Sequence, residues 1–449
     1  MKRRIFVQLA ALAAWARSRP LLAAAGAGQA AQLGSTLTPL GAEKAGNQAG
    51  TIPAWNGGLP QGAMKRGADP FAADRPLYVI TPGNADQYAG VLTEGHKALL
   101  ATFPDYKMPV YPSRRSASYP DWYYQATIDN ATQVSLTDHG YGFTGTARGA
   151  PFPLPASATE AMWNHIMRYN TAGWRGYLNS AVTQRDGGYT LGRAYLQLTY
   201  IYNNRNYSAA QLDNQNLYAM IKTVAPPDKA GTADLLRVPI DRVKEDTKIW
   251  EFNTALQRVR RIGNVGYDNP LFDGLMTQDQ VDMFNGPLDR YTVKLLGKRE
   301  MLVPYNAYRL YSPRIKYRDI VHPGHLNQDL TRYELHRVWV IQADLRPGFS
   351  HIYRKRYFYL DEDSWLILLE DIYDDRLQFW RTAEAHAINY GDVPVVIAGV
   401  QVHYDLQSRR YVILNMTNEE KDFVEYDWQR PPSYFTPQQL QRFATAGVV

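Results

Sequence analysis

The chain has 449 residues, 45% of them apolar and 20% charged, so it can bury a large core and is not disordered over most of its length. The net charge of +6 is small and is spread along the chain, which argues against a nucleic-acid-binding protein. The absence of cysteine excludes disulfides, thiolate nucleophiles, cysteine-ligated metals and an N-terminal lipidated cysteine. The 32 Tyr, 14 Phe and 10 Trp favour strands and a β-rich binding protein.

Residues 1–30 are predicted to be a signal peptide. Three basic residues precede an apolar run at residues 5–16, and small residues with A-x-A sites follow. The run is too short to span a bilayer. Because Arg3 and Arg4 resemble the core of a twin-arginine signal, both the general secretory route and the twin-arginine route stay open. Either route predicts a periplasmic protein, and no later run of 18 apolar residues indicates a membrane span.

Residues 31–82 are rich in Gly, Pro and Ala and predict an extended N-terminal arm, which wraps the body or a partner. Apolar residues at helical spacing predict an amphipathic helix over 84–103. A second helix is predicted over 157–170, where Ser157 and Glu160 form a capping box. Both helices are expected to cover a sheet.

From about residue 188 the pattern changes to a period of two, which is typical of strands. A short helix begins at Thr277 and ends before Gly286. The predicted strands in this region are 190–202, 216–226, 233–241 and 248–262.

The strongest strand pattern lies between residues 333 and 390, where short links require antiparallel neighbours. The predicted strands are 333–345, 351–360, 365–373 and 377–388. With a turn at 361–364, Arg354 is predicted opposite Asp371 on one face of the sheet, and Lys355 with Glu370 on the other face. The residues predicted to share the face of Arg354 are Trp339, Ile341, Ile352, Arg356, Phe358, Trp365, Ile367, Leu369 and Asp371. A slip of one residue would exchange the two faces.

These elements predict an α+β fold with one large, strongly curved antiparallel sheet, covering helices and an extended N-terminal arm. Residues 83–449 are predicted to form a single body. Neither face of the predicted sheet is plainly hydrophilic, so we expect helices or curvature to cover it.

Several stretches, among them HRVWVIQADLRPGFSHIYRKRYFYLDEDSWLILLEDIYDDRLQFWR, PFPLPASATEAMWNHIMRYN and LGSTLTPLGAEKAGNQAGTIPAWNGGL, resemble the family labelled domain of unknown function 1329. That family is similar to the periplasmic lipoprotein carrier LolA and the outer-membrane receptor LolB. The resemblance implies an unclosed antiparallel barrel over an apolar cavity, and a lipid-handling periplasmic protein, often encoded near export pumps. It implies no catalytic residues.

Motifs for a metal, a cofactor or catalysis are weak. His322 and His325, with Asp329 nearby, could supply metal ligands, but the Pro-Gly between them makes a turn and no third ligand is specified. The acidic residues at 361–363 and 374–375 are typical of turns. No nucleophile elbow, phosphate loop, dinucleotide fingerprint or zinc signature occurs, so we predict no cofactor, no metal and no catalytic residue.

Arginines on predicted strands need partners, because an unpaired buried charge is costly. The set is Arg258, Arg260, Arg261, Arg354 and Arg356. Pairing with acidic residues is the plain interpretation. The alternative is that an arginine binds the carboxylate or phosphate of an amphiphile, since planar guanidinium matches both groups. An arginine lining an open cavity with no carboxylate in reach would favour the alternative.

The sequence therefore predicts a non-enzymatic periplasmic carrier for a lipid or similar amphiphile, with transient membrane-surface contact and an export pump or outer-membrane protein as further partners. The predicted ligand-binding residues are Trp339, Ile341, Arg354, Arg356, Phe358, Trp365, Ile367 and Leu369. Two alternatives remain: an envelope hydrolase acting on a hydrophobic ester or glycan, and a structural adaptor of an envelope complex whose sheet is filled by its own side chains.

Overall fold

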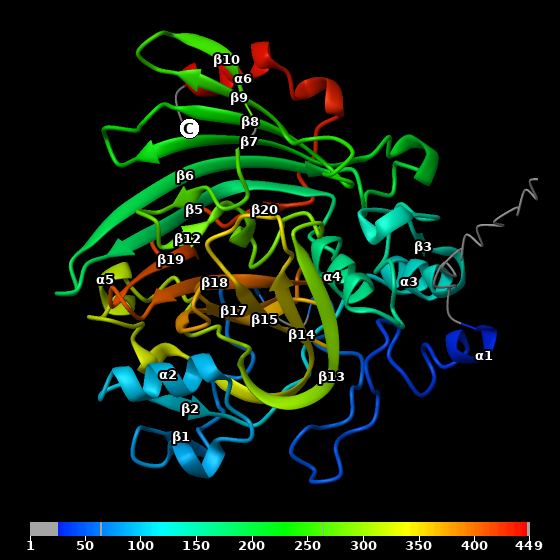
Figure 1. The fold of residues 1–449 in the computed structure, drawn as a ribbon, viewed down its shortest axis with the longest axis vertical. Helices are drawn as coiled ribbons and strands as arrows, with labels where there is room; N and C mark the ends of the chain where they lie inside the picture. The colour runs from blue at the N-terminus through cyan, green and yellow to red at the C-terminus, as the bar shows by residue number, and fades with distance from the viewer. Residues whose placement is uncertain (1–25, 63–64, 264, 447–449) are drawn as a thin grey trace, which may run out of the picture.

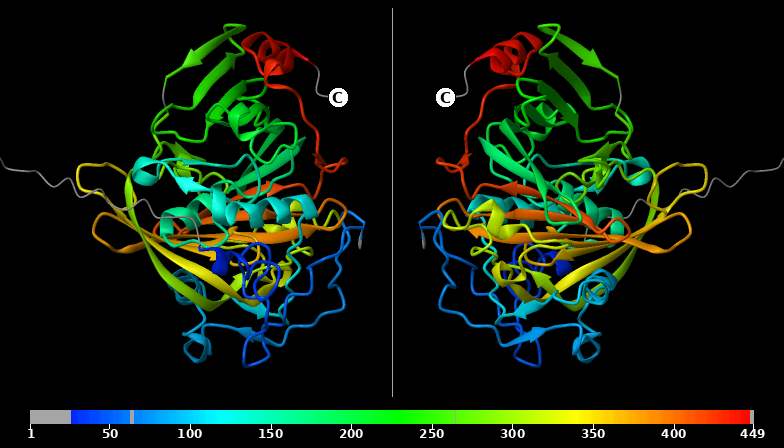
Figure 2. Two further views of the ribbon diagram at one scale, coloured as in Figure 1. Left: turned by 90° about the vertical axis from the view of Figure 1, so that its right-hand side faces the viewer. Right: turned by 90° about the vertical axis from the view of Figure 1, so that its left-hand side faces the viewer.

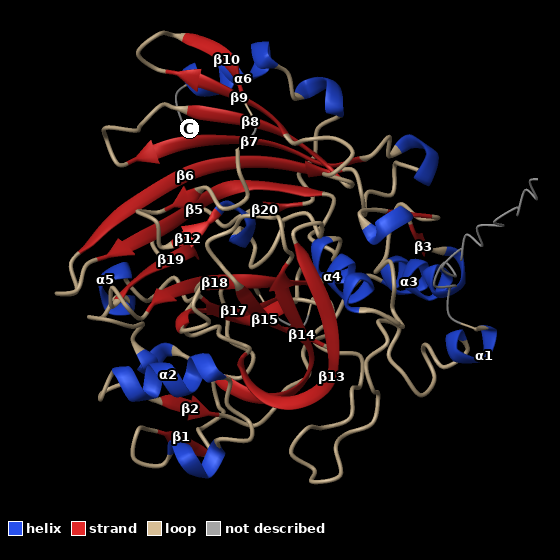
Figure 3. Ribbon diagram, in the orientation of Figure 1, coloured by secondary structure: helices blue, strands red, loops and turns tan. Residues whose placement is uncertain are grey.

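A computed structural model describes residues 26–62, 65–263 and 265–446, and strands dominate it (Figures 1 and 3). The longer strands of the first half are β5 (Gly173–Thr183), β6 (Tyr189–Tyr200), β7 (Gln215–Ala225), β8 (Ala233–Pro239), β9 (Lys248–Asn253) and β10 (Arg258–Ile262). Those of the second half are β13 (Tyr291–Pro304), β14 (Tyr333–Leu345), β15 (Lys355–Asp361), β16 (Ile367–Tyr373), β17 (Phe379–Tyr390), β18 (Val395–Asp405) and β19 (Arg410–Met416).

Short strands and helices complete the structure. The short strands are β1 (Tyr78–Ile80), β2 (Met108–Val110), β3 (Ser135–Leu136), β4 (Phe143–Thr144), β11 (Pro270–Leu271), β12 (Met276–Thr277) and β20 (Glu425–Tyr426). The α-helices are α1 (Ala27–Ala30), α2 (Glu94–Thr102), α3 (Asp121–Gln133), α4 (Ala158–Ile166), α5 (Tyr317–Ile320) and α6 (Pro437–Thr445). Single 3₁₀ turns lie at Ala85–Tyr88, Asp138–Gly140, Ala209–Gln211, Gln278–Gln280, Gln328–Leu330 and Pro432–Tyr434.

Sixteen strands form one sheet in the order β1-β2-β14-β15-β16-β17-β18-β19-β5-β6-β7-β8-β9-β10, with β13 beside β14 and β20 beside β5. The pairing is antiparallel except for one parallel contact, between Tyr333 and Val110. Among the described strands, β10 has no partner on its outer side, so the sheet does not close into a barrel. The predicted class, an α+β fold built on one large antiparallel sheet, is confirmed.

Several predicted elements have different bounds in the structure. The strand predicted over 248–262 is a hairpin, because a turn separates β9 from β10 and Gln257 adopts a positive φ of 49° there. The helix predicted over 84–103 begins as α2 at residue 94, where the Thr93 side chain accepts the backbone N–H of His96. The capping box before α4 is correct, since Ser157 accepts the backbone N–H of Glu160, but α4 ends at Ile166.

The predicted register between β15 and β16 is wrong. Asp371 lies opposite Tyr357, and Glu370 lies opposite Phe358. Arg354 lies just before β15, and its backbone N–H donates to the backbone oxygen of Tyr373. The reason lies in the connection, because Trp365 has a positive φ of 62° and belongs to the turn. The pairing of β15 with β16 also shifts at a bulge between Tyr359 and Leu360.

The predicted pairing of Lys355 with Glu370 is also wrong. The ammonium of Lys355 lies 3.4 Å from Asp344, on the neighbouring strand β14. Phe358 and Glu370 therefore share one face of the sheet, whereas Leu369 and Asp371 lie on the other.

We name the two sides of the sheet the Phe358 face and the Asp371 face. The Phe358 face is continuous from β14 to β5, because residues on it pair across every pair of neighbouring strands. The successive cross-strand partners are Ile341, Phe358, Glu370, Ala383, His403, Val412 and Val182. On the Asp371 face, the backbone N–H of Gly95 in α2 donates to Asp371, and α6 packs against β7–β10 (Figure 2). The Asp371 face is thus covered in both halves of the sheet.

The N-terminal residues in the range 31–82 contact the rest of the chain. Ile52 is 1% exposed, and the indole N–H of Trp55 donates to the backbone oxygen of Ala117. Most of the predicted signal peptide, residues 1–25, lies outside the described residues. Within the described chain, no helix combines the length and apolarity needed to cross a bilayer.

Candidate functional site

The residues predicted to line a ligand cavity lie mostly in the packed core. Five of them are at most 1% exposed, and these are Ile341, Phe358, Trp365, Ile367 and Leu369. They belong to the main hydrophobic cluster of the protein. They have no room for a ligand, because the chain's own side chains surround them.

A segment that we call the plug, residues 271–288, fills the Phe358 face over β15–β19. The ring of Phe284 lies 5.3 Å from that of Phe358, and Leu275 and Met276 pack against Val412. The Gln280 amide N–H donates to Glu370. Where the sequence predicted an empty hollow, the structure therefore has a filled one.

Arg356 is tied to the plug rather than to a ligand. Its Nη1 lies 2.6 Å from Asp279 of the plug, and its Nε lies 2.5 Å from Glu370. Burial opposes ionisation of Asp279, but Arg356 and His351 hold the pKa of this carboxyl well below its usual range. Arg354 is exposed and outside the core. The plain interpretation, pairing with acidic residues, is correct for Arg356, for which the sequence named no particular partner.

The plug does not fill the Phe358 face over β5–β9. Residues 265–285 reach this part of the face only at its edge, where Val265 and Tyr267 line a small pocket of about 80 Å³ with Leu236, Val238 and Ile249. Half-buried apolar side chains there pack against none of the hydrophobic clusters of the described residues. These side chains are Trp174, Leu178, Leu196, Leu217, Ile221, Leu236 and Ile249. Between them lie Leu198, Ala219 and Val238, which are 3–8% exposed. In Figure 1 no described helix lies in front of β6–β9, and α6 lies behind them. We call this surface the open face.

Charged groups lie at the β10 end of the open face. Asp234 is the cross-strand neighbour of Ile221 and of Glu251, and Glu251 pairs with Arg260 at 3.0 Å. Burial, reinforced by the charge of Glu251, raises the pKa of Asp234 to about 6. The open face is therefore apolar in its centre and ionic at one end, which is the arrangement that an amphiphile requires.

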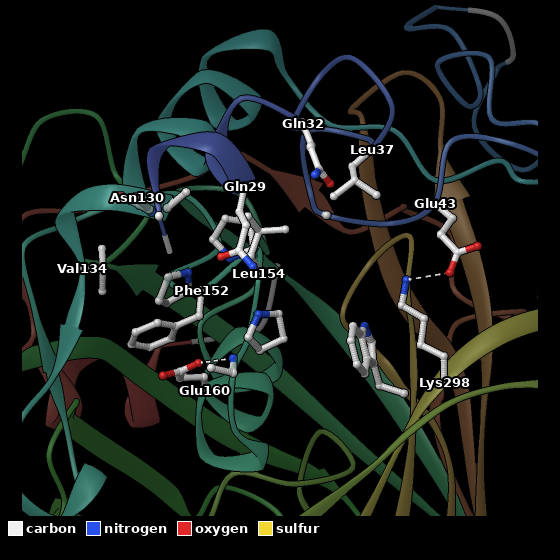
Figure 4. Close-up of a pocket in the computed structure, with 18 residues that line it drawn as sticks. Gln29, Gln32, Leu37, Glu43, Asn130, Val134, Phe152, Leu154, Glu160 and Lys298 are labelled. Atoms are coloured by element: carbon white, nitrogen blue, oxygen red, sulfur yellow. Dashed lines mark hydrogen bonds and ion pairs between the residues drawn. The ribbon is translucent and has the colours of Figure 1, made fainter. Parts of the chain in front are cut away.

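Trp339 is the one predicted ligand residue that lines a described pocket. This pocket has a volume of about 480 Å³ and lies between the N-terminal residues, α3, the loop before α4 and strands β13 and β14 (Figure 4). Phe152 and Leu154 form an apolar wall, and the ammonium of Lys298 lies 4.9 Å from the ring centre of Trp339. Lys298 is already paired with Glu43 and Glu362, so it is not a free cation.

One group of side chains has the geometry of a metal site. His336, Asp361 and Asp363 offer ligand atoms within 4.8 Å of one another, and Glu334 accepts a hydrogen bond from His336 at 3.0 Å. However, Arg115 already binds both oxygens of Asp363, at 2.6 and 2.8 Å. An arginine thus supplies the positive charge that a metal would bring, and we assign the group to the structure of the turn.

The two histidines considered as metal ligands from the sequence do not gather with Asp329. Asp329 pairs with Lys107 at 2.6 Å, and His325 lies 3.3 Å from Asp105. The ring centres of His322 and His325 are 6.4 Å apart.

Comparison with known proteins places the chain in a family. The model described as "Protein of unknown function (DUF1329)" matches residues 79–441. A protein of Pseudomonas aeruginosa described as "Uncharacterized protein PA3922" is 44% identical over 430 residues, which is 94% of each chain.

Solved structures show a partial likeness. A putative outer membrane lipoprotein-sorting protein domain from Vibrio parahaemolyticus has a TM-score of 0.41 and 14% identity, over 60% of this chain and 92% of its own. A DUF1329 family protein from Desulfovibrio piger has a TM-score of 0.41 and 12% identity, with the same coverage of 60% and 92%. A LolA superfamily protein from Nitrosomonas europaea has a TM-score of 0.38 and 12% identity, over 63% and 98% of the two chains. The family predicted from the sequence is confirmed: the chain belongs to the DUF1329 family of proteins of unknown function.

Proposed function

We propose that the protein binds the apolar part of a lipid or similar amphiphile on the open face, and carries it through the periplasm without changing it chemically. The observation that supports the proposal is the open face itself. Soluble proteins seldom leave a contiguous apolar surface wetted unless it binds something. Its side chains come from five adjacent strands and contact no hydrophobic cluster of the described chain.

The hydrophobic effect provides enough free energy for this role. Covering apolar surface contributes roughly 25 cal/mol per Å², and an acyl chain contributes about 0.8 kcal/mol for each CH2 that it buries. Part of this gain is lost to the ordering of the ligand. Because no specific polar contact is needed, a range of acyl chains would bind.

The proposed location follows from the N-terminal sequence, where basic residues precede an apolar run as in export signals. A carrier in the periplasm needs a donor and an acceptor. We propose an export pump or an outer-membrane protein for these roles, with brief contact to a membrane surface.

Two leucine-to-lysine substitutions test the proposal. Leu196→Lys places a charge in the centre of the open face, whereas Leu256→Lys changes a leucine that is 61% exposed in the β9–β10 turn. We expect Leu196→Lys to weaken the binding of a fluorescent fatty acid at least tenfold, and Leu256→Lys to leave it unchanged. Equal affinity of the two variants would refute binding on the open face.

The adaptor alternative also has an observation in its favour, because the plug fills the Phe358 face over β15–β19. A protein partner, rather than a lipid, would then cover the open face. In that case Leu196→Lys would abolish capture of a partner protein, and neither purified variant would bind the fatty acid.

A further inference from the structure

The largest of the described pockets has no part in the proposed function. Its volume is about 810 Å³, and it forms where residues 67–79 meet residues 107–111, 306–315 and 329–332. We call it the basic pocket. None of its lining residues belongs to the open face.

Basic side chains outnumber acidic ones around this pocket. The basic residues are Arg75, Lys107, Arg309, Arg314 and Arg332, and the acidic residues are Asp69, Asp74 and Asp329. Two of the three acids are already paired, because Asp74 lies 2.8 Å from both Arg114 and Arg332, and Asp329 lies 2.6 Å from Lys107. The pocket therefore has an excess of positive charge.

Three of the arginines have no carboxylate partner among the described residues. The side chains of Arg309 and Arg314 make no ion pair or hydrogen bond there, and Arg75 reaches only the backbone oxygens of Ala72 and Asp74. A single exposed arginine is ordinarily hydrated. Several around one pocket repel each other, and a bound anion would remove that repulsion.

Arg332 gives the pocket a fixed cation. It is 7% exposed, Glu334 and Asp74 hold its Nε and Nη2, and its guanidinium lies 4.7 Å from the ring centre of Tyr111. Among the described contacts, its Nη1 has no hydrogen-bond partner. One guanidinium nitrogen of a nearly buried, ordered side chain thus remains available to a ligand.

Apolar groups complete the lining. Phe71, Tyr308 and Ile315 lie among the arginines, and Val79 is 37% exposed. Leu77, next to the lining residue Pro76, is 64% exposed. A ligand that matches this surface has a compact anion joined to an apolar part.

We propose that the basic pocket binds a phosphate group, with the apolar part of the same ligand lying along Val79 and Leu77. Guanidinium groups bind phosphate through paired N–H donors, and several of them can share its oxygens. The phosphate belongs either to a lipid headgroup or to a soluble phosphate compound. The proposal does not depend on the open face.

Two double variants with the same net charge test it. Arg309→Gln with Arg314→Gln removes two cations from the pocket, and Arg299→Gln with Arg376→Gln removes two exposed cations elsewhere. The probes are phosphatidylcholine vesicles with and without phosphatidylglycerol, measured by co-sedimentation, and inorganic phosphate, measured by calorimetry.

We expect the pocket variant to bind at least tenfold more weakly than the wild type, and the control variant to bind as the wild type does. Binding to phosphatidylglycerol vesicles that phosphate competes away identifies a lipid headgroup, whereas binding of phosphate alone identifies a soluble compound. Equal losses in the two variants, or no binding of either probe by the wild type, would overturn the proposal. Fatty-acid binding should be the same in all three proteins, because we assign it to the open face. The phosphate proposal and the open-face proposal can therefore be refuted separately.

Discussion

Replacing Asp279 by Asn should loosen the plug, because this carboxylate links the plug to the sheet. Asp279 lies 2.6 Å from Arg356 and 3.3 Å from His351, and it accepts a 2.6 Å hydrogen bond from Thr277. Asp279, Arg356 and Glu370 are at most 3% exposed. The amide can still accept the hydrogen bond from Thr277, so the variant removes mainly the charge.

Breaking a buried ion pair typically costs about 3–5 kcal/mol, because the remaining charge stays buried without its partner. The matched control is Glu251→Gln, which breaks a pair whose Arg260 side chain is 60% exposed, and it should cost at most about 1 kcal/mol. Urea unfolding followed by circular dichroism gives the two free energies, and hydrogen exchange reports opening of residues 275–284. If Asp279→Asn lost no more stability than Glu251→Gln, the ion pair would not hold the plug.

Three further predictions concern stability. Burial raises the pKa of Asp361 and of Asp371 from 3.8 to about 6, so the folded chain keeps these protons to a higher pH than the unfolded chain. The stability that they contribute is full below about pH 4 and is lost as the pH rises through about 6, and Asp371→Asn should flatten this decline in unfolding experiments across that range. Leu440→Ala, in the fully buried contact of α6 with β7–β10, should cost about 2–5 kcal/mol in urea unfolding, and a loss below 1 kcal/mol would show that α6 is not packed as described. Thr436 caps α6 by accepting the N–H of Gln439, so Thr436→Ala should cost about 1 kcal/mol in the same assay, and no loss would contradict the cap.

Period-two patterns predicted most long strands correctly. Strands β6, β7, β8 and β14 lie within about two residues of their predicted bounds. Their β-branched and aromatic residues at a period of two are typical of strands. The strands β5, β13, β18 and β19 were not predicted. In β5, small residues such as Gly176 interrupt the apolar pattern on which the prediction depends.

The predicted register of the β15–β16 hairpin determined which residues were predicted to pair across the two strands. A turn over 361–364 placed Arg354 beside Asp371, whereas the positive φ of Trp365 lengthens the turn and shifts the pairing. Aromatic residues seldom adopt this conformation, so alternation alone could not reveal it. Because the shift is by an odd number of residues, it moved Leu369 and Asp371 to the other face.

The position of the ligand surface could not be predicted, because it depends on which part of the chain covers which half of the sheet. Residues 271–288 are far from β15–β19 in sequence but fill their Phe358 face. The open face lies in β5–β9. The sequence predicted strands for β6–β9 but not for β5, and it gave no sign that one side of them was uncovered. The basic pocket was equally hidden, since its arginines come from three separate segments.

Native mass spectrometry of the protein purified from cells that produce it naturally, followed by organic extraction, tests the carrier role most directly. We expect a co-purifying lipid bound to the wild type and to Leu256→Lys, and loss of that lipid from Leu196→Lys. A wild-type protein that carries no lipid and binds no fluorescent fatty acid would contradict the proposed function.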